Sequence, residues 1–279
     1  MKQSVSIFKT GLLMAFLTAL FVVVGTTIAG RAGAVIFFAI SLIMNLGAYW
    51  FSDKIALAMA KAKELDESQA PQIFADVRDL CQKMGLPMPR IYVSPEMQPN
   101  AFATGRNPSH SAICVTQGLL QVLDRDEVRS VLAHELGHVK NHDVLITTIA
   151  AVVAGAISSI ANIAIFFPSN DNDRNPFAEI LMIILAPIAA TLIQLAISRS
   201  REYAADATSA EYTNKPRDLA DALIKIDNVA QNVPMNVNPA FASLYIENPL
   251  SGNGISRLFS THPSTADRVA RLMQMESNN

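Results

Sequence analysis

Residues 124–140 read DRDEVRSVLAHELGHVK, and this stretch carries the strongest structural signal in the chain. Asp124, followed three residues later by Glu127, has the capping-box pattern of a helix start. Apolar residues then recur at helical spacing up to position 139, which predicts one buried face. The stretch is therefore predicted to be a helix. Its first turns carry so many charges that it cannot lie deep in hydrocarbon.

The same helix carries an H-E-x-x-H pattern formed by His134, Glu135 and His138. At ~3.6 residues per turn, histidines four apart project from one face and can bind one metal ion. Glu135 follows the first histidine, where a carboxylate can accept a proton from an attacking water molecule. The pattern predicts one Zn²⁺ per chain with Glu135 as the catalytic base. The alternative is a polar helix face with two histidines and no metal.

Four stretches free of charged residues indicate that part of the chain lies in lipid. They cover residues 11–30, 32–52, 144–167 and 180–198, and the composition is 51% hydrophobic and only 16% charged. Each stretch is long enough to cross a hydrocarbon core of ~30 Å as a helix. We predict four transmembrane helices. A cleaved signal peptide is the alternative for the first stretch, and buried core helices are the alternative for all four.

Basic residues in the short flanks predict the orientation of these helices. A four-span arrangement leaves Arg31 and Arg174 in the two outer turns. The other flanking basic residues fall on the opposite side: Lys2, Lys9, Lys54, Lys61, Lys63, Lys140, Arg199 and Arg201. Both termini and the H-E-x-x-H helix are therefore expected in the cytoplasm.

A third metal ligand is expected from the segment after the fourth stretch, because catalytic zinc usually has three protein ligands. Glu202 and Asp206 lie four apart there, on one helix face. If the outer turn is centred near Asn170, His138 and Glu202 each lie 32 residues from it, since 170 − 138 = 202 − 170 = 32. Antiparallel helices of equal length bring both residues to the same height. Glu202 is therefore predicted as the ligand, with Asp206 hydrogen-bonded to a ligand histidine; the alternative is an ordinary solvated pair of carboxylates.

Short strands are predicted between the second stretch and the H-E-x-x-H helix. Residues 90–93 and 112–115 read as strands, and residues 100–105 as a third. An edge strand beside the metal could pair with an extended peptide. Asn100, Ala101 and Phe102 are the candidate substrate contacts, with a plain turn and a core aromatic residue as the alternative.

Near the C-terminus, His262 precedes a proline, and Arg268 lies in the helical run that follows. Both residues are candidate catalytic groups, because a fixed donor can stabilise the oxyanion of a tetrahedral intermediate. Structural roles are the alternative for both.

Together these motifs resemble the HtpX family, bacterial membrane zinc metalloproteases of the gluzincin type that are related to the CAAX prenyl endopeptidases. The resemblance covers essentially the whole chain. It is carried by the paired N-terminal stretches, residues 100–103 (NAFA), the H-E-x-x-H pattern, Glu202 with Asp206, and residues 261–264 (THPS). It implies an endopeptidase of the inner membrane that degrades damaged or misfolded membrane proteins at the cytoplasmic face as part of a stress response. Self-cleavage is a further possibility.

The predicted fold is a mainly α membrane protein with four transmembrane helices. A cytoplasmic α+β, zincin-like protease domain has a small sheet beside the H-E-x-x-H helix. Residues 1–52 and 144–198 are the two transmembrane hairpins, and residues 53–143 and 199–279 are the two cytoplasmic parts.

Two rival functions remain on sequence grounds: a membrane-bound zinc aminopeptidase, and a membrane scaffold with a structural metal. A structural zinc site normally has four protein ligands, often cysteines, and Cys81 and Cys114 have no obvious place in such a shell. The net charge of −2 and the lack of an extended basic cluster predict that nucleic acid is not a partner.

Overall fold

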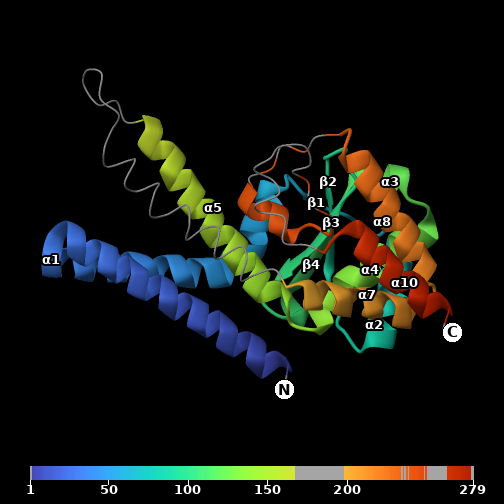
Figure 1. The fold of residues 1–279 in the computed structure, drawn as a ribbon, viewed down its shortest axis with the longest axis horizontal. Helices are drawn as coiled ribbons and strands as arrows, with labels where there is room; N and C mark the ends of the chain where they lie inside the picture. Colours follow the sequence, from blue (N-terminus) through green and yellow to red (C-terminus); the bar gives the residue numbers. More distant parts are fainter. Residues whose placement is uncertain are drawn as a thin grey trace.

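The computed structural model describes residues 2–166, 198–233, 235, 237, 239–247, 249 and 263–277. Figure 1 shows two long arms of helix α1 and the outer part of helix α5 projecting from a domain of strands and shorter helices. The domain contains the H-E-x-x-H helix and the small sheet.

Helix α1 (Lys2–Met59) consists of two apolar helices joined by a sharp turn at Ala29 and Gly30. Gly30 has φ of 57°, a left-handed conformation that favours glycine. The arms touch beside this turn, where a Cβ on Gly33 would lie only 2.0 Å from the carbonyl oxygen of Gly25. The segments Thr10–Thr27 and Ala29–Met59 are both long and apolar enough to cross a membrane. The expected N-terminal pair of apolar helices is therefore confirmed.

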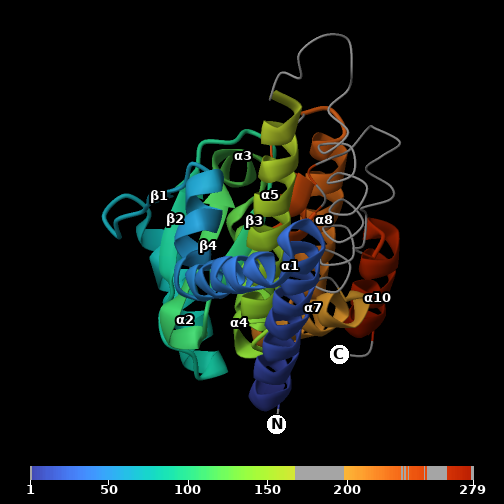
Figure 2. The same cartoon turned by 90° about the vertical axis from the view of Figure 1, so that its left-hand side faces the viewer.

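Helix α5 (Val144–Phe166) begins where the third apolar stretch was predicted. It packs against α1, and its outer part projects from the domain on the same side as the arms of α1 (Figure 1), so that it lies in front of the domain in Figure 2. The fourth predicted stretch, residues 180–198, lies outside the described residues except for Ser198.

The sheet is mixed and has four strands in the order β1-β2-β4-β3. Strand β2 (Arg90–Ser94) pairs with β4 (Ser111–Thr116) in parallel, and β3 (Ala101–Gly105) pairs with β4 antiparallel. These are the three predicted strands. Strand β1 (Lys63–Glu64), antiparallel to β2, was not predicted.

Both faces of the sheet are buried, because the two hydrophobic cores of the protein lie on opposite sides of it. Alternate side chains point to opposite faces of a strand. Tyr92, Phe102, Ala112 and Cys114 pack with α1, α5 and residues 241–245. Ile91, Ala101, Ala103, Ile113 and Val115 pack with the helices of the domain. The sheet thus lies between α1 on one face and the helices that carry the candidate site on the other.

The remaining helices are α2 (Pro71–Met84), α3 (Gln117–Val122), α4 (Arg125–Lys140), α7 (Arg199–Thr213), α8 (Pro216–Ala230) and α10 (Thr265–Ser277), with 3-10 turns η1 (Pro108–His110) and η2 (Pro239–Leu244). Helix α4 contacts α2, α7 and α8 and is the centre of the domain. It begins with the predicted capping box, in which the side chains of Asp124 and Glu127 each accept from the other's backbone N–H.

Candidate metal and active site

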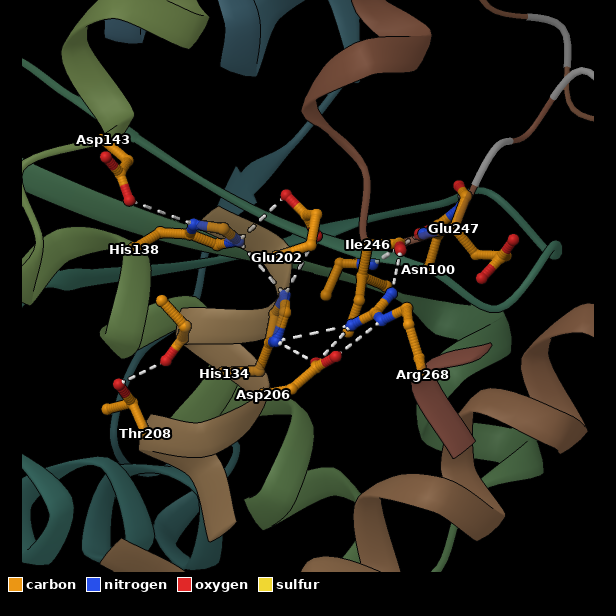
Figure 3. A network of polar contacts seen from close by, with 12 residues as sticks. Asn100, His134, His138, Asp143, Glu202, Asp206, Thr208, Ile246, Glu247 and Arg268 are labelled. Atoms are coloured by element: carbon orange, nitrogen blue, oxygen red, sulfur yellow. Dashed lines mark hydrogen bonds and ion pairs between the residues drawn. The ribbon is translucent and has the colours of Figure 1, made fainter. Parts of the chain in front are cut away.

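Helices α4 and α7 bring together three side chains that could hold a metal ion (Figure 3). Nε2 of His134 lies 3.1 Å from Nε2 of His138. The carboxylate of Glu202 lies 3.7 Å from the first of these nitrogens and 3.6 Å from the second. One donor atom from each residue falls within a 4.8 Å cluster. The structure therefore places the three predicted ligands around a single point.

The absence of a side chain at Gly137 allows α7 to approach α4 closely. A Cβ on Gly137 would lie 3.2 Å from both Cα of Ala205 and Cβ of Thr208. Near the far end of α7, the buried hydroxyl of Ser209 donates to the carbonyl of Ser130 at 2.7 Å. Both contacts fix the position of α7 along the axis of α4, and this position sets the distance from Glu202 to the two histidines.

Each histidine has a carboxylate behind it that turns its Nε2 toward the same point. Oδ1 of Asp206 lies 2.9 Å from Nδ1 of His134, which is the contact expected for Asp206. Oδ2 of Asp143 lies 3.9 Å from Nδ1 of His138. A carboxylate at hydrogen-bond distance, as Asp206 is, fixes the tautomer of a histidine and increases its basicity, whereas Asp143 is farther away and acts on His138 mainly through its charge.

These residues fit a divalent transition-metal ion. Two nitrogens that share a tetrahedral ion at ~2.0–2.1 Å are roughly 3.3 Å apart, close to the separation of the two histidine nitrogens. Two imidazoles and one carboxylate are a donor set of catalytic metal sites, which keep a further position open for water or substrate.

Asp143 is a site residue that the sequence reasoning missed. It follows the end of α4, where His142 has φ of 58° and the N–H of Asp143 donates to the carbonyl of His138. This left-handed turn brings the carboxylate back toward the ring of His138. The signal available in the sequence was a carboxylate immediately before an apolar run, five residues after a ligand histidine.

The two histidines differ in charge. Burial lowers the pKa of His134 to about 4, although Asp206 acts in the opposite direction. Burial also opposes a charge on His138, but the carboxylates of Glu202 and Asp143 outweigh it and raise the pKa to about 9. His134 is therefore ready to bind a metal at neutral pH, whereas His138 has to release a proton.

Metal affinity is therefore expected to increase with pH. Below the pKa of His138, about 9, each bound ion displaces one proton, so affinity should rise about tenfold per pH unit and level off above that pKa. Competition with a chromophoric chelator for Zn²⁺ at several pH values measures this slope. Replacing the exposed His110 by Gln is the control and should leave the slope unchanged. An affinity that is flat between neutral pH and the pKa of His138 would contradict the assignment.

Arg268 lies behind the site and not at its open side. It is fully buried, and its guanidinium donates to Asp206 at 2.9 and 2.6 Å and to the carbonyl of Ile246 at 2.9 Å. Burial opposes ionisation of Asp206, yet Arg268 and His134 hold the pKa of that carboxyl down at about 2. The structure thus makes Arg268 the counterion of the carboxylate that orients His134. His262, the other candidate from this region, lies outside the described residues.

Replacing Arg268 by Leu is expected to destabilise the protein by about 3–5 kcal/mol, because it leaves the buried Asp206 without its counterion. The thermal unfolding midpoint should fall by on the order of 10 °C. Arg271→Leu on the same helix is the matched control. Arg271 is exposed and stacks on Tyr203, so its loss should cost about 1 kcal/mol or less. Equal midpoints for the two variants would show that the buried pair is not important.

Glu135 lies in a narrow cavity with His138 and Glu202. The cavity has a volume of about 30 Å³ and is closed on one side by residues 243–246. Burial raises the pKa of Glu135 to about 7, although the charge of His138 and the backbone N–H of Ala103 act against this shift. A carboxyl group with this pKa is suited to accept and return a proton near neutral pH. Arg201 lines the same cavity and is a second residue that the sequence reasoning did not single out.

Asn100, which precedes β3, and Ala101, the first residue of β3, are hydrogen-bonded to residues 246 and 247 of the same chain. Nδ2 of Asn100 donates to the carbonyl of Glu247 at 2.9 Å, and Oδ1 of Asn100 accepts from the N–H of Glu247 at 3.3 Å. The N–H of Ile246 donates to the carbonyl of Ala101 at 2.9 Å. Residues 246 and 247 thus occupy the hydrogen-bonding positions that an extended peptide was expected to use at Asn100 and Ala101.

Phe102 points away from the cavity. Its side chain is buried on the opposite face of the sheet, with its ring 5.1 Å from that of Tyr245. Ala103, the next residue of β3, lines the cavity beside Glu135.

The H-E-x-x-H helix, the carboxylate from a second helix and the two apolar N-terminal helices define a membrane-associated metallopeptidase. Comparisons with known proteins agree with this class. Peptidase family M48 matches residues 67–276, and the chain belongs to this family. It is a membrane-bound metalloprotease.

Two relatives named Protease HtpX homolog align with nearly the whole chain. The one from Pelotomaculum thermopropionicum is 52% identical over 275 residues, which are 96% of this chain and 98% of the relative. The one from Paraburkholderia phytofirmans is 53% identical over 273 residues, 96% of each. Among solved structures, Ste24p from S. mikatae has the same fold with a TM-score of 0.50 and 21% identity; the match covers 97% of this chain and 64% of that one.

Proposed function

We propose that this metalloprotease is a zinc endopeptidase of the bacterial inner membrane, and that His134, His138 and Glu202 hold the zinc ion. The observation that carries the proposal is the convergence of these three side chains, two of which, His138 and Glu202, line one cavity with Glu135. A bound zinc ion supplies a Lewis acid that polarises a carbonyl group and acidifies water.

The residues of the chain have separate roles in this proposal. Glu135 accepts a proton from the attacking water and delivers it to the nitrogen of the leaving amine, so no acyl-enzyme forms. Asp206 and Asp143 orient the two histidines, and Arg268 holds Asp206 in its charged form. His262 and Arg201 are the proposed donors to the oxyanion.

We further propose that the substrate pairs with the edge of β3. Ala103 lines the cavity, so a peptide beside it would have its scissile bond next to Glu135. Asn100 and Ala101 now hold residues 246 and 247, which would have to shift to extend the pairing. Phe102 supports the strand from behind.

The proposed topology has four spans, two hairpins and both termini in the cytoplasm. It is supported by the apolar arms of α1, by the start of α5 at Val144 and by the distribution of basic residues. We propose that the substrates of a site at the cytoplasmic face of the membrane are damaged or misfolded membrane proteins. An aminopeptidase remains the alternative, whereas the comparisons leave no support for a scaffold.

The test is hydrolysis by the detergent-purified protein after removal of metal with a chelator. One equivalent of Zn²⁺ should restore cleavage of casein at internal bonds, and it should also restore cleavage of a peptide with an acetylated N-terminus. Failure to bind Zn²⁺ stoichiometrically would reject the proposal. Cleavage restricted to peptides with a free N-terminus would identify an aminopeptidase instead.

A further inference from the structure

A second cavity, of about 290 Å³, lies where the membrane helices meet the protease domain. Met14, Val139 and Leu145 form apolar parts of its wall, and Arg106 and His142 are among its polar residues. It is separate from the metal site, since Val144 is the only residue that the two cavities share among the described residues.

The cavity lies at the level where three apolar helices reach the domain. Thr10 begins the apolar segment of the first arm of α1, Tyr49 lies ten residues before the end of the second arm at Met59, and Val144 begins α5. Both arms of α1 pack against the first half of α5, residues 145–154, which lies next to the sheet (Figures 1 and 2). Given the membrane placement proposed above, on which this step rests, the cavity opens at the depth of the lipid headgroups.

The positive charge of Arg106 in this cavity favours binding of an anion. Arg106 places its guanidinium 4.6 Å from the ring centre of Trp50. Within the described parts of the chain, no carboxylate lies within salt-bridge distance of Arg106, and none lines the cavity. The metal cavity differs sharply, since Glu135, Asp143 and Glu202 line it. A planar guanidinium without an internal counterion is a strong binder of phosphate.

We propose that this cavity binds the phosphate of an anionic phospholipid from the cytoplasmic leaflet. Arg106 contacts the phosphate, and the polar side chains of Asn107 and Ser111 line the same cavity. The acyl chains extend past Met14 and Leu145 into the bilayer. A volume of about 290 Å³ admits the glycerophosphate part of a lipid and leaves its chains outside. The lipid would fix the height of the protease domain on the membrane.

Trp50 makes the proposal directly testable, because it is the only tryptophan of the chain and lies under Arg106. The protein is reconstituted into phosphatidylcholine vesicles that contain equal fractions of either brominated phosphatidylglycerol or brominated phosphatidylcholine, and quenching of Trp50 fluorescence is compared. The anionic lipid should show a roughly fivefold higher apparent affinity, the ratio given by ~1 kcal/mol per cation near an anionic surface.

Arg106→Gln should abolish this preference. Arg217→Gln is the matched control, because Arg217 is an exposed cation on α8 that pairs with Asp221, and this variant should keep the preference. Gly11→Leu is the second variant. It adds a side chain to the cavity wall where a Cβ meets no atom within 4 Å, and it should also abolish the preference although every cation remains.

Equal quenching by both lipids in the wild type, or a preference that survives both Arg106→Gln and Gly11→Leu, would overturn the proposal. Relief of the quenching by casein would show that the cavity belongs to the substrate path, and the lipid site would be rejected. The measurement needs neither metal nor turnover, so its failure is distinguishable from failure of the zinc endopeptidase proposal.

Discussion

Replacing Glu135 by Gln is expected to lower kcat for casein hydrolysis by about 10²–10⁴-fold, the usual contribution of a general base, while metal binding stays intact. Glutamine has nearly the same shape, but its amide cannot accept a proton from water. The three candidate donor atoms belong to His134, His138 and Glu202, so Glu135→Gln leaves all three metal-ligand side chains in place.

The measurement combines initial rates with elemental analysis of the same sample. Glu211→Gln is the matched control, because Glu211 lies exposed on α7, and this variant should retain full activity. If the Glu135→Gln variant turned casein over at the wild-type rate, Glu135 would not be the base. If it lost its metal, the carboxylate would have a structural role at the site instead.

The parts of the site that the sequence predicted depend on local geometry. The i, i+4 spacing of His134 and His138 places both rings on one face of any helix, whatever packs around it. The capping box at Asp124 is equally local. Glu202 needed one long-range step, the equal lengths of two antiparallel helices. Helices α4 and α7 do meet, but the left-handed turn at His142 divides α4 from α5, so the continuous helix from His138 that this step assumed is wrong.

The parts that the sequence did not predict depend on tertiary packing. Asp143 reaches His138 only because His142 adopts a left-handed conformation at the end of α4. Arg268 looks like any surface cation of an amphipathic helix, yet α10 turns it inward onto Asp206. Burial of such a cation becomes visible only when its partner is known.

The sheet illustrates the same limit. Strands β2, β3 and β4 are rich in apolar and β-branched residues, and these were found from the sequence. Strand β1 has only two residues, both charged and exposed, so no pattern marks it. Phe102 was expected near the substrate because an edge strand beside the metal could pair with a peptide, but the sheet is covered on both faces, and Phe102 points toward α1 and α5.

Replacing Glu202 by Ala is expected to weaken metal binding by more than about 100-fold. Loss of a residue that only supports a ligand typically costs 10–100-fold, and Glu202 would be a direct donor. Asp206→Asn should fall within that smaller range, because it weakens the hydrogen bond to His134 and leaves all three donors in place. A larger loss of metal affinity in Glu202→Ala than in Asp206→Asn therefore distinguishes a direct metal ligand from a residue that only supports a ligand. Competition with a chelator measures both affinities.

A second readout of Glu202→Ala does not involve metal at all. The carboxylate of Glu202 is the main reason that the pKa of His138 lies at about 9 despite burial. Without that carboxylate, burial is opposed only by Asp143 and Glu135, so the pKa of His138 should fall, and NMR titration of the imidazole protons would detect the shift. Full metal occupancy in Glu202→Ala would remove Glu202 from the ligand set. An unchanged pKa of His138 would mean that the two side chains do not face each other as the structure places them.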